Sequence, residues 1–172
     1  GVAEVDPRIV MWNVIPIIPA DGVEKAKAVP SRGTPQFGMI YSEVPGLSQL
    51  FLIEGRAPER VGSLDDPGLV GEFVMDARTA EDHRFAIGET YRISSPTGLR
   101  DFVLVGIFNF GDPDENKTVG ANMSAFDRLT AQEFLDMEGL FDELEVTMAL
   151  CGCATVADIT PDAVTEFSGT CS

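Results

Sequence analysis

Runs of apolar, β-branched and aromatic residues, interrupted at short intervals by polar turn residues, dominate the middle third of the chain. The strongest run is RDFVLVGIFNF at residues 100–110, and shorter runs occur at 71–77 (GEFVMDA) and 89–95 (ETYRISS). Their length and composition are typical of β-strands. The turn residues at 96–98 (PTG) separate two of these runs. The pattern therefore predicts a series of strands joined by tight turns.

Apolar residues also dominate positions 8–20 and 37–44, where we expect further strands. Pro16 and Pro19 restrict the second half of the first segment to an edge or a bend, because proline lacks the backbone donor that a central strand needs. The polar segment between them, residues 22–36, is punctuated by turn residues and is typical of a loop or the tip of a long hairpin.

The helical patterns are short, and they are fewer than the strand patterns. RTAEDHR at 78–84 fits one or two helical turns, and LTAQEFLDM at 129–137 fits a second helix, which Thr130 would cap together with Glu133 in a capping box. A third candidate covers 160–167, where a threonine and a proline occupy the expected first positions. Helices beside a majority of strands predict an α+β fold.

The charge and composition of the chain exclude some classes of binding partner. The chain of 172 residues has a formal net charge of -16, with 12 basic and 28 acidic side chains and no cluster of lysine or arginine. This balance excludes an electrostatic surface for nucleic acid or anionic lipid. The apolar share of 44% is that of a folded protein. No apolar run approaches the roughly 20 residues of a membrane-spanning helix.

His83 is the one histidine of the chain and lies among carboxylates, so it is the first candidate for acid–base chemistry. A short helix at 77–84 would place Ala80 and Arg84 on one face and spread Glu81, Asp82 and His83 around the exposed side. No serine lies in a Gly-x-Ser-x-Gly elbow. We therefore expect no catalytic residue and interpret the cluster as a solvated helix surface.

Metal and cofactor motifs are incomplete. Asp112, Asp114 and Asn116 have the opening spacing of an EF-hand calcium loop, but Lys117 replaces the glycine of that pattern and Met123 replaces its final glutamate. An ordinary Asp/Asn turn is the favoured interpretation. The chain contains no Walker loop and no dinucleotide-binding fingerprint, so we expect neither a metal nor a cofactor.

All cysteines lie near the C-terminal end of the sequence, at Cys151, Cys153 and Cys171. On a strand Cys151 and Cys153 point to the same face, and the predicted helix at 160–167 would return Cys171 toward them. We predict a Cys153–Cys171 disulfide, which leaves Cys151 free or paired between chains. A zinc site that adds His83 is disfavoured by the short C-x-C spacing and by the distance of the histidine in sequence.

An ordered series of short motifs covers roughly residues 50–150. In order, they are GRAP at 55–58, GEFVMD at 71–76, Ala80 in the short helix, IGE at 87–89 and FVLVGI at 102–107. This series resembles the extracytoplasmic core domain of ABC transporter permeases of the MacB/FtsX-like family. Glu89 stands where the family commonly has aspartate, and residues 151–172 carry no motif of the family.

The resemblance implies a domain between the first and second transmembrane helices, on the extracytoplasmic face of the cell membrane. It implies a non-catalytic role in substrate export, substrate handling or mechanical transmission. The expected partners are a cytoplasmic ABC ATPase subunit, a second permease copy through the membrane part, and an extracytoplasmic protein. Within the domain, Gly88 would supply a positive φ between helix and strand, while Asp76 and Thr79 would cap the helix.

We therefore expect one strand-rich α+β domain of two lobes. A discontinuous mixed α/β lobe would comprise about residues 1–54 and 141–172, and a small β-rich lobe of about 55–140 would be inserted into it. The alternative is a secreted or surface binding module. Its long loops around 21–35 and 111–121 would hold a ligand or a protein.

Overall fold

The computed structural model describes residues 5–8, 10–20, 25–31, 33–42, 48–136 and 143–146. The strands are β1 (Val5–Arg8), β2 (Val10–Trp12), β3 (Ile15–Ile18), β4 (Lys27–Ala28), β5 (Gln36–Ile40), β6 (Leu50–Gly55), β7 (Gly71–Asp76), β8 (Thr90–Ser95), β9 (Gly98–Phe110), β10 (Asn122–Phe126) and β11 (Glu143–Val146). The helices of this described part are α1 (Ala77–His83) and α2 (Arg128–Phe134). None of its helices has the length and apolar character needed to cross a membrane.

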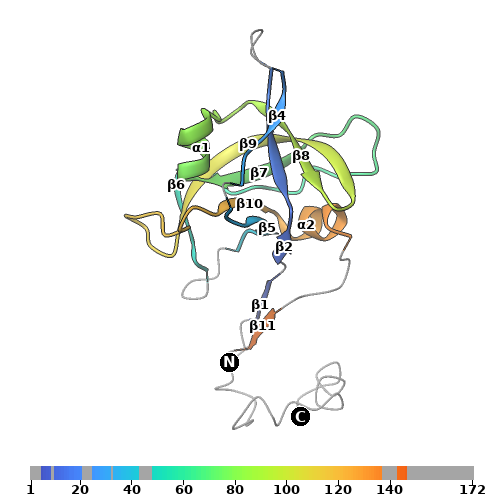
Figure 1. Ribbon diagram of the computed structural model, residues 1–172. Coiled ribbons are helices and arrows are strands. Elements are labelled where there is room, and N and C mark those ends of the chain that lie inside the picture. The colour runs from blue at the N-terminus through green and yellow to red at the C-terminus, as the bar shows by residue number, and fades with distance from the viewer. Residues whose placement is uncertain are drawn as a thin grey trace, which may run out of the picture.

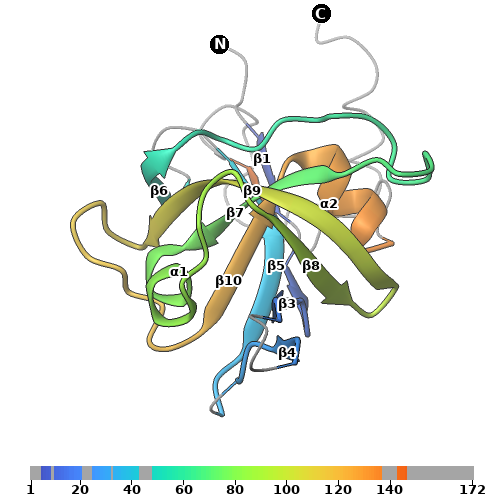
Figure 2. The same ribbon diagram turned by 90° about the horizontal axis from the view of Figure 1, so that it is seen from above.

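One large, curled sheet forms the body of the molecule (Figures 1 and 2). Its strand order is β2-β5-β10-β7-β9-β8-β3-β4, and β6 also pairs with β9. Most neighbours are antiparallel, but β10 is parallel to β5 and β7 is parallel to β9. A separate antiparallel pair, β1 with β11, lies below the large sheet in Figure 1.

The expected α+β fold of two lobes is wrong, because the protein is mostly β. Strands from both proposed lobes belong to a single sheet, in which those of the inserted lobe lie between those of the first segment. β5, from the first segment, pairs with β10, and β3 pairs with β8. These pairings join segments that are far apart in sequence. Because every buried backbone N–H and C=O group needs a hydrogen-bond partner, the strands of both segments pair into one continuous sheet.

The local strand predictions in the middle of the chain are confirmed. β7, β8 and β9 occupy the three predicted runs, and β8 and β9 pair as a hairpin with Ser95 opposite Gly98. The first predicted strand is divided into β2 and β3 at Asn13, which has a φ of 63°. β3 and β4 pair antiparallel, in agreement with the hairpin interpretation of the polar segment.

Four phenylalanines occupy the centre of the larger core. Phe73, Phe102 and Phe126 come from neighbouring strands of the sheet, and Phe134 comes from α2. The ring of Phe102 lies 5.0 Å from that of Phe126 and 4.9 Å from that of Phe134, measured between centroids. The contacts of Phe134 with Phe102 and Phe126 help to hold α2 on the sheet.

The predicted cap of α2 is wrong. Asp127 is the N-cap, and its carboxylate accepts hydrogen bonds from the backbone of Leu129 and Thr130. Thr130 lies inside the helix and is buried. Glu133 turns away from the cap toward the loop that precedes β7. The capping-box pattern failed because a stronger N-cap residue precedes it in sequence and a distant loop binds the glutamate.

At α1 the expected cap at Asp76 is confirmed, whereas the expected capping role of Thr79 and the expected position of Arg84 are wrong. Thr79 lies inside the helix and is buried. Asp76 is the N-cap, and its carboxylate accepts a hydrogen bond from the backbone N–H of Thr79. Arg84 does not share the buried face of Ala80, because it is the exposed C-cap residue in the left-handed conformation, with a φ of 59°. Gly88 has the expected positive φ, at 91°.

Candidate functional site

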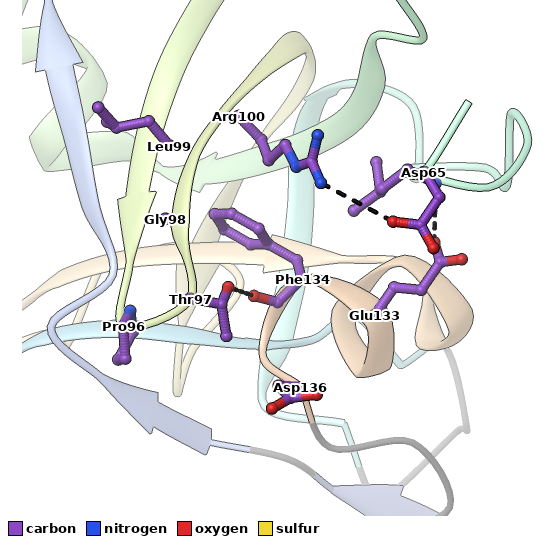
Figure 3. A pocket seen from close by; sticks show the side chains of 10 residues that line it. Asp65, Pro96, Thr97, Gly98, Leu99, Arg100, Glu133, Phe134 and Asp136 are labelled. Atoms are coloured by element: carbon purple, nitrogen blue, oxygen red, sulfur yellow. Dashed lines mark hydrogen bonds and ion pairs between the residues drawn. The ribbon is translucent and has the colours of Figure 1, made fainter. Parts of the chain in front are cut away.

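A cavity of about 600 Å³ lies between the β8–β9 turn and the C-terminal end of α2 (Figure 3). Three separate segments of the chain form its wall, namely the loop before β7, the turn and the end of α2. Its lining residues are Leu64, Asp65, Pro96, Thr97, Gly98, Leu99, Arg100, Glu133, Phe134 and Asp136.

The β8–β9 turn is hydrogen-bonded directly to the end of α2. The hydroxyl groups of Thr97 and Ser95 both donate to the backbone carbonyl of Phe134, at 2.6 and 3.2 Å. That carbonyl has no partner within the helix, since the last carbonyls of any helix are unpaired by helical hydrogen bonds. The turn therefore completes the helix end and holds this side of the cavity in place.

Glu133 holds the opposite side of the cavity. Its carboxylate accepts hydrogen bonds from the hydroxyl of Ser63 at 2.7 Å and from the backbone N–H of Leu64 at 2.9 Å, and it pairs with Arg60 at 3.0 Å. Burial alone would raise the pKa of this carboxyl group, but these hydrogen bonds and the arginine charge lower its pKa to about 2. Glu133 is therefore a charged structural bridge at neutral pH.

The mouth of the cavity is charged and partly apolar. Arg100 and Asp65 approach to 3.9 Å across it, and both side chains are largely exposed (Figure 3). Leu99, next to Arg100, is 57% exposed. Such a surface can bind a small molecule or a peptide through ionic and apolar contacts.

The cavity lining has no nucleophile paired with a base. Thr97 donates its hydroxyl proton to a carbonyl, and Glu133 is committed to its three partners. His83 does not line this cavity, because it lies in α1. The arrangement favours binding over acid–base catalysis.

His83 itself is half-buried, and its ring lies edge-on against Phe85 with the centroids 6.5 Å apart. Its helix carries an exposed ion pair between Arg78 and Asp82. Of the nearby carboxylates, Asp76 is fully buried and accepts hydrogen bonds from Thr79, Asn116 and Met123. Asp76 therefore joins α1, the 111–121 loop and β10, which is an architectural role.

In the acidic loop at 111–118, the side chains of Asp112, Asn116 and Lys117 form hydrogen bonds within the protein. Asp112 accepts hydrogen bonds from the backbone of Asp114 and from the Lys117 ammonium group, and this ammonium lowers the pKa of Asp112. Asn116 donates to Asp76 and accepts from the backbone of Phe110. Within the part of the chain that the structure describes, no group of His, Cys, Asp or Glu side chains is arranged to hold a metal.

The two loops that the binding-module alternative assigns to a ligand are in contact with each other. The hydroxyl of Thr34 donates to the carbonyl of Gly120 at 2.7 Å, and the amide of Asn122 donates to the carbonyl of Pro30 at 3.5 Å. A small pocket of about 20 Å³ lies beside these contacts. These contacts pack the loops together.

The predicted disulfide of Cys153 with Cys171, and its alternative through Cys151, lie outside the described residues. They remain predictions.

The sequence alone does not predict the cavity. Asp65, Arg100 and Glu133 are separated by long stretches of chain and come together only through the fold.

A comparison with models of known protein families finds no match. Among curated proteins, a stretch of 31 residues is 87% identical to part of a protein named L-lactate oxidase from Roseobacter sp. strain GAI101. The match covers 18% of this chain and 8% of the length of that protein. It is too short to assign a family or an activity to this chain.

Proposed function

We propose that this chain is a non-catalytic extracytoplasmic domain of an ABC transporter permease that contributes to substrate export, substrate handling or mechanical transmission. The observation that carries the proposal is the antiparallel ladder of β1 with β11, in which Val5 lies opposite Val146 and Arg8 lies opposite Glu143. The two ends of a domain inserted between neighbouring membrane helices must lie close together, and this ladder holds residues 5–8 beside residues 143–146 (Figure 1).

The contacts between the motifs also support the resemblance on which the proposal rests. Arg56 of the GRAP segment forms two hydrogen bonds with Glu72 of β7, and the backbone of Glu59 donates to the same carboxylate at 3.0 Å. The hydrogen bonds from Arg56 lower the pKa of Glu72, and this carboxylate raises the pKa of Arg56. The two motifs therefore act as one structural unit.

In this proposal the domain transmits movement or guides substrate, and the chemistry occurs elsewhere. ATP hydrolysis belongs to a cytoplasmic ABC ATPase subunit, and the permease dimerises through its membrane part.

The test uses the full-length protein that contains this chain, purified in detergent from its own host. We expect a membrane protein that copurifies in fixed stoichiometry with a Walker-motif ATPase. Deleting residues 5–146 should leave nucleotide hydrolysis by the complex in place but abolish its coupling to transport. Recovery of the protein without an ATPase, or in the culture medium, would contradict the proposal.

The cavity of Figure 3 favours a second candidate function, a secreted or surface ligand-binding module. The same purification separates the two candidates. A binding module would be recovered outside the membrane, and Arg100→Ala together with Thr97→Val would then weaken binding of its ligand.

A further inference from the structure

A second, shallower groove of about 330 Å³ lies between β6 and α1, which Figures 1 and 2 show on the same side of the molecule. Its apolar part comprises Ile53 of β6, Ile107 of β9, Ala77 and Ala80 of α1, and Phe85. Ile53 is 50% exposed, although Ala80 and Phe85 beside it are buried. The groove therefore presents an apolar side chain to solvent above an apolar floor.

A β-bulge places Ile53 there. Leu52 pairs with Phe108 of β9 and Glu54 pairs with the adjacent Ile107, so Ile53 has no partner on β9. A bulge redirects the extra side chain and often lies near functional sites.

Glycines on both strands allow the chains to approach at this bulge. A Cβ at Gly106 would overlap the carbonyl oxygen of Arg56, and a Cβ at Gly55 would overlap that of Val105. Gly55 also has a positive φ of 76°. The exposure of Ile53 is thus built into the backbone geometry.

Carboxylates stand on both walls of the groove. Glu54 lies on the β6 wall and Glu81 on the α1 wall, and both side chains are exposed. Within the described residues, neither carboxylate forms a side-chain hydrogen bond or an ion pair. Arg84 also lines the groove and can donate to backbone carbonyls. The walls carry net negative charge on a chain whose formal net charge is -16.

We propose that this groove docks an extended segment of a partner protein that presents an apolar side chain between basic residues. The apolar side chain would pack on Ile53, Ile107 and Phe85, and the flanking basic groups would pair with Glu54 and Glu81. An apolar centre with charged groups at its rim is the usual organisation of a protein interface. The inference does not depend on the proposed transport function.

The test is a titration of the isotope-labelled 172-residue chain with three amidated hexapeptides, followed by NMR. The first has two central leucines flanked by lysines, the second replaces the lysines with glutamates, and the third replaces the leucines with glycines. We expect only the first to bind, and to shift signals of the groove residues. Binding should weaken as salt is raised, because rim charges are screened.

Substitutions distinguish binding in the groove from nonspecific electrostatic attraction of a basic peptide to an acidic protein. Ile53→Asp, and separately the pair Glu54→Lys with Glu81→Lys, should each raise the Kd of the lysine–leucine peptide about tenfold or more. The matched control is Leu99→Asp, because Leu99 is similarly exposed, at 57%, and does not line the groove. The control should leave the Kd unchanged.

Three outcomes would overturn the proposal. These are absence of binding at millimolar peptide, equal binding of the glutamate or glycine peptides, and equal effects of Ile53→Asp and Leu99→Asp. Because all the substituted side chains are exposed, the variants should remain folded, which their amide spectra check directly.

Discussion

At the scale of single residues, the most consequential side chain is Asp76. It is fully buried and accepts hydrogen bonds from the backbone of Thr79, the backbone of Met123 and the amide of Asn116. Asp76→Ala removes a helix cap and leaves buried donors without partners, so we expect a loss of about 3 kcal/mol in unfolding free energy.

Urea denaturation of the Asp76→Ala variant measures this loss, with Asp82→Ala as the matched control. The Asp82 side chain is 43% exposed and its ion pair with Arg78 is long, at 3.8 Å. The control should change the unfolding free energy by less than about 0.5 kcal/mol. Equal effects of the two substitutions would show that the hydrogen bonds of Asp76 to α1, the 111–121 loop and β10 do not stabilise the fold.

Glu133 should make stability depend on pH. Its pKa falls from the ordinary 4.5 to about 2 in the folded protein. A lowered folded-state pKa contributes stability that is fully present above pH 4.5 and is lost as pH falls toward 2. Because the side chain is 18% exposed, we expect a contribution of about 2 kcal/mol.

The measurement compares the unfolding free energies of the wild type and Glu133→Gln between pH 7 and pH 2. The wild type should be more stable at pH 7, and the difference should shrink through the acidic range. A difference in unfolding free energy that stays constant down to pH 2 would mean that the ionised Glu133 carboxylate does not stabilise the folded protein.

At the scale of elements, the β6–β9 bulge depends on Gly106. A Cβ there would overlap the backbone carbonyl of Arg56 and come within 3.1 Å of that of Glu54. Since backbone atoms cannot move aside as a flexible side chain can, we expect Gly106→Ala to cost about 2 to 3 kcal/mol and to increase hydrogen exchange in β6.

Gly62→Ala is the control for this substitution. A Cβ at Gly62 would meet mainly the end of the flexible Leu69 side chain. Its cost should stay below about 1 kcal/mol. Comparable losses in the two variants, or unchanged exchange in β6 of Gly106→Ala, would contradict the account of the bulge.

Local elements could be predicted from the sequence because their signals are local. The strands of the β8–β9 hairpin are apolar runs around a PTG turn, and Gly88 marks a turn that requires a positive φ. The cap of α2 could not be predicted correctly, because Glu133 binds Ser63 and Leu64 from a remote loop. Residue periodicity contains no information about such a partner.

At the scale of the whole molecule, the two-lobe prediction failed for the same reason. β10 lies between β5 and β7, parallel to one and antiparallel to the other. Apolar patterns identify strands but do not specify which distant strands pair. The groove depends on the pairing of β6 with β9, and the cavity depends on contacts of α2 with a remote turn and loop, so the sequence alone predicts neither.

At the same scale, the proposed function requires that this domain lie on the extracytoplasmic face of the membrane as part of a permease. The most direct measurement labels a single cysteine in the full-length protein, in cells with an intact inner membrane. Cys151, Cys153 and Cys171 are changed to serine, and Val119→Cys provides the reporter, because Val119 is 91% exposed. Ala125→Cys, at a fully buried position, is the control for unfolding.

The account predicts that a membrane-impermeant maleimide labels the Val119→Cys protein in intact cells as fully as after lysis. The Ala125→Cys protein should remain unlabelled in both. The labelled protein should stay in the membrane fraction. Labelling of Val119→Cys that appears only after lysis would place the domain on the cytoplasmic side and contradict the account.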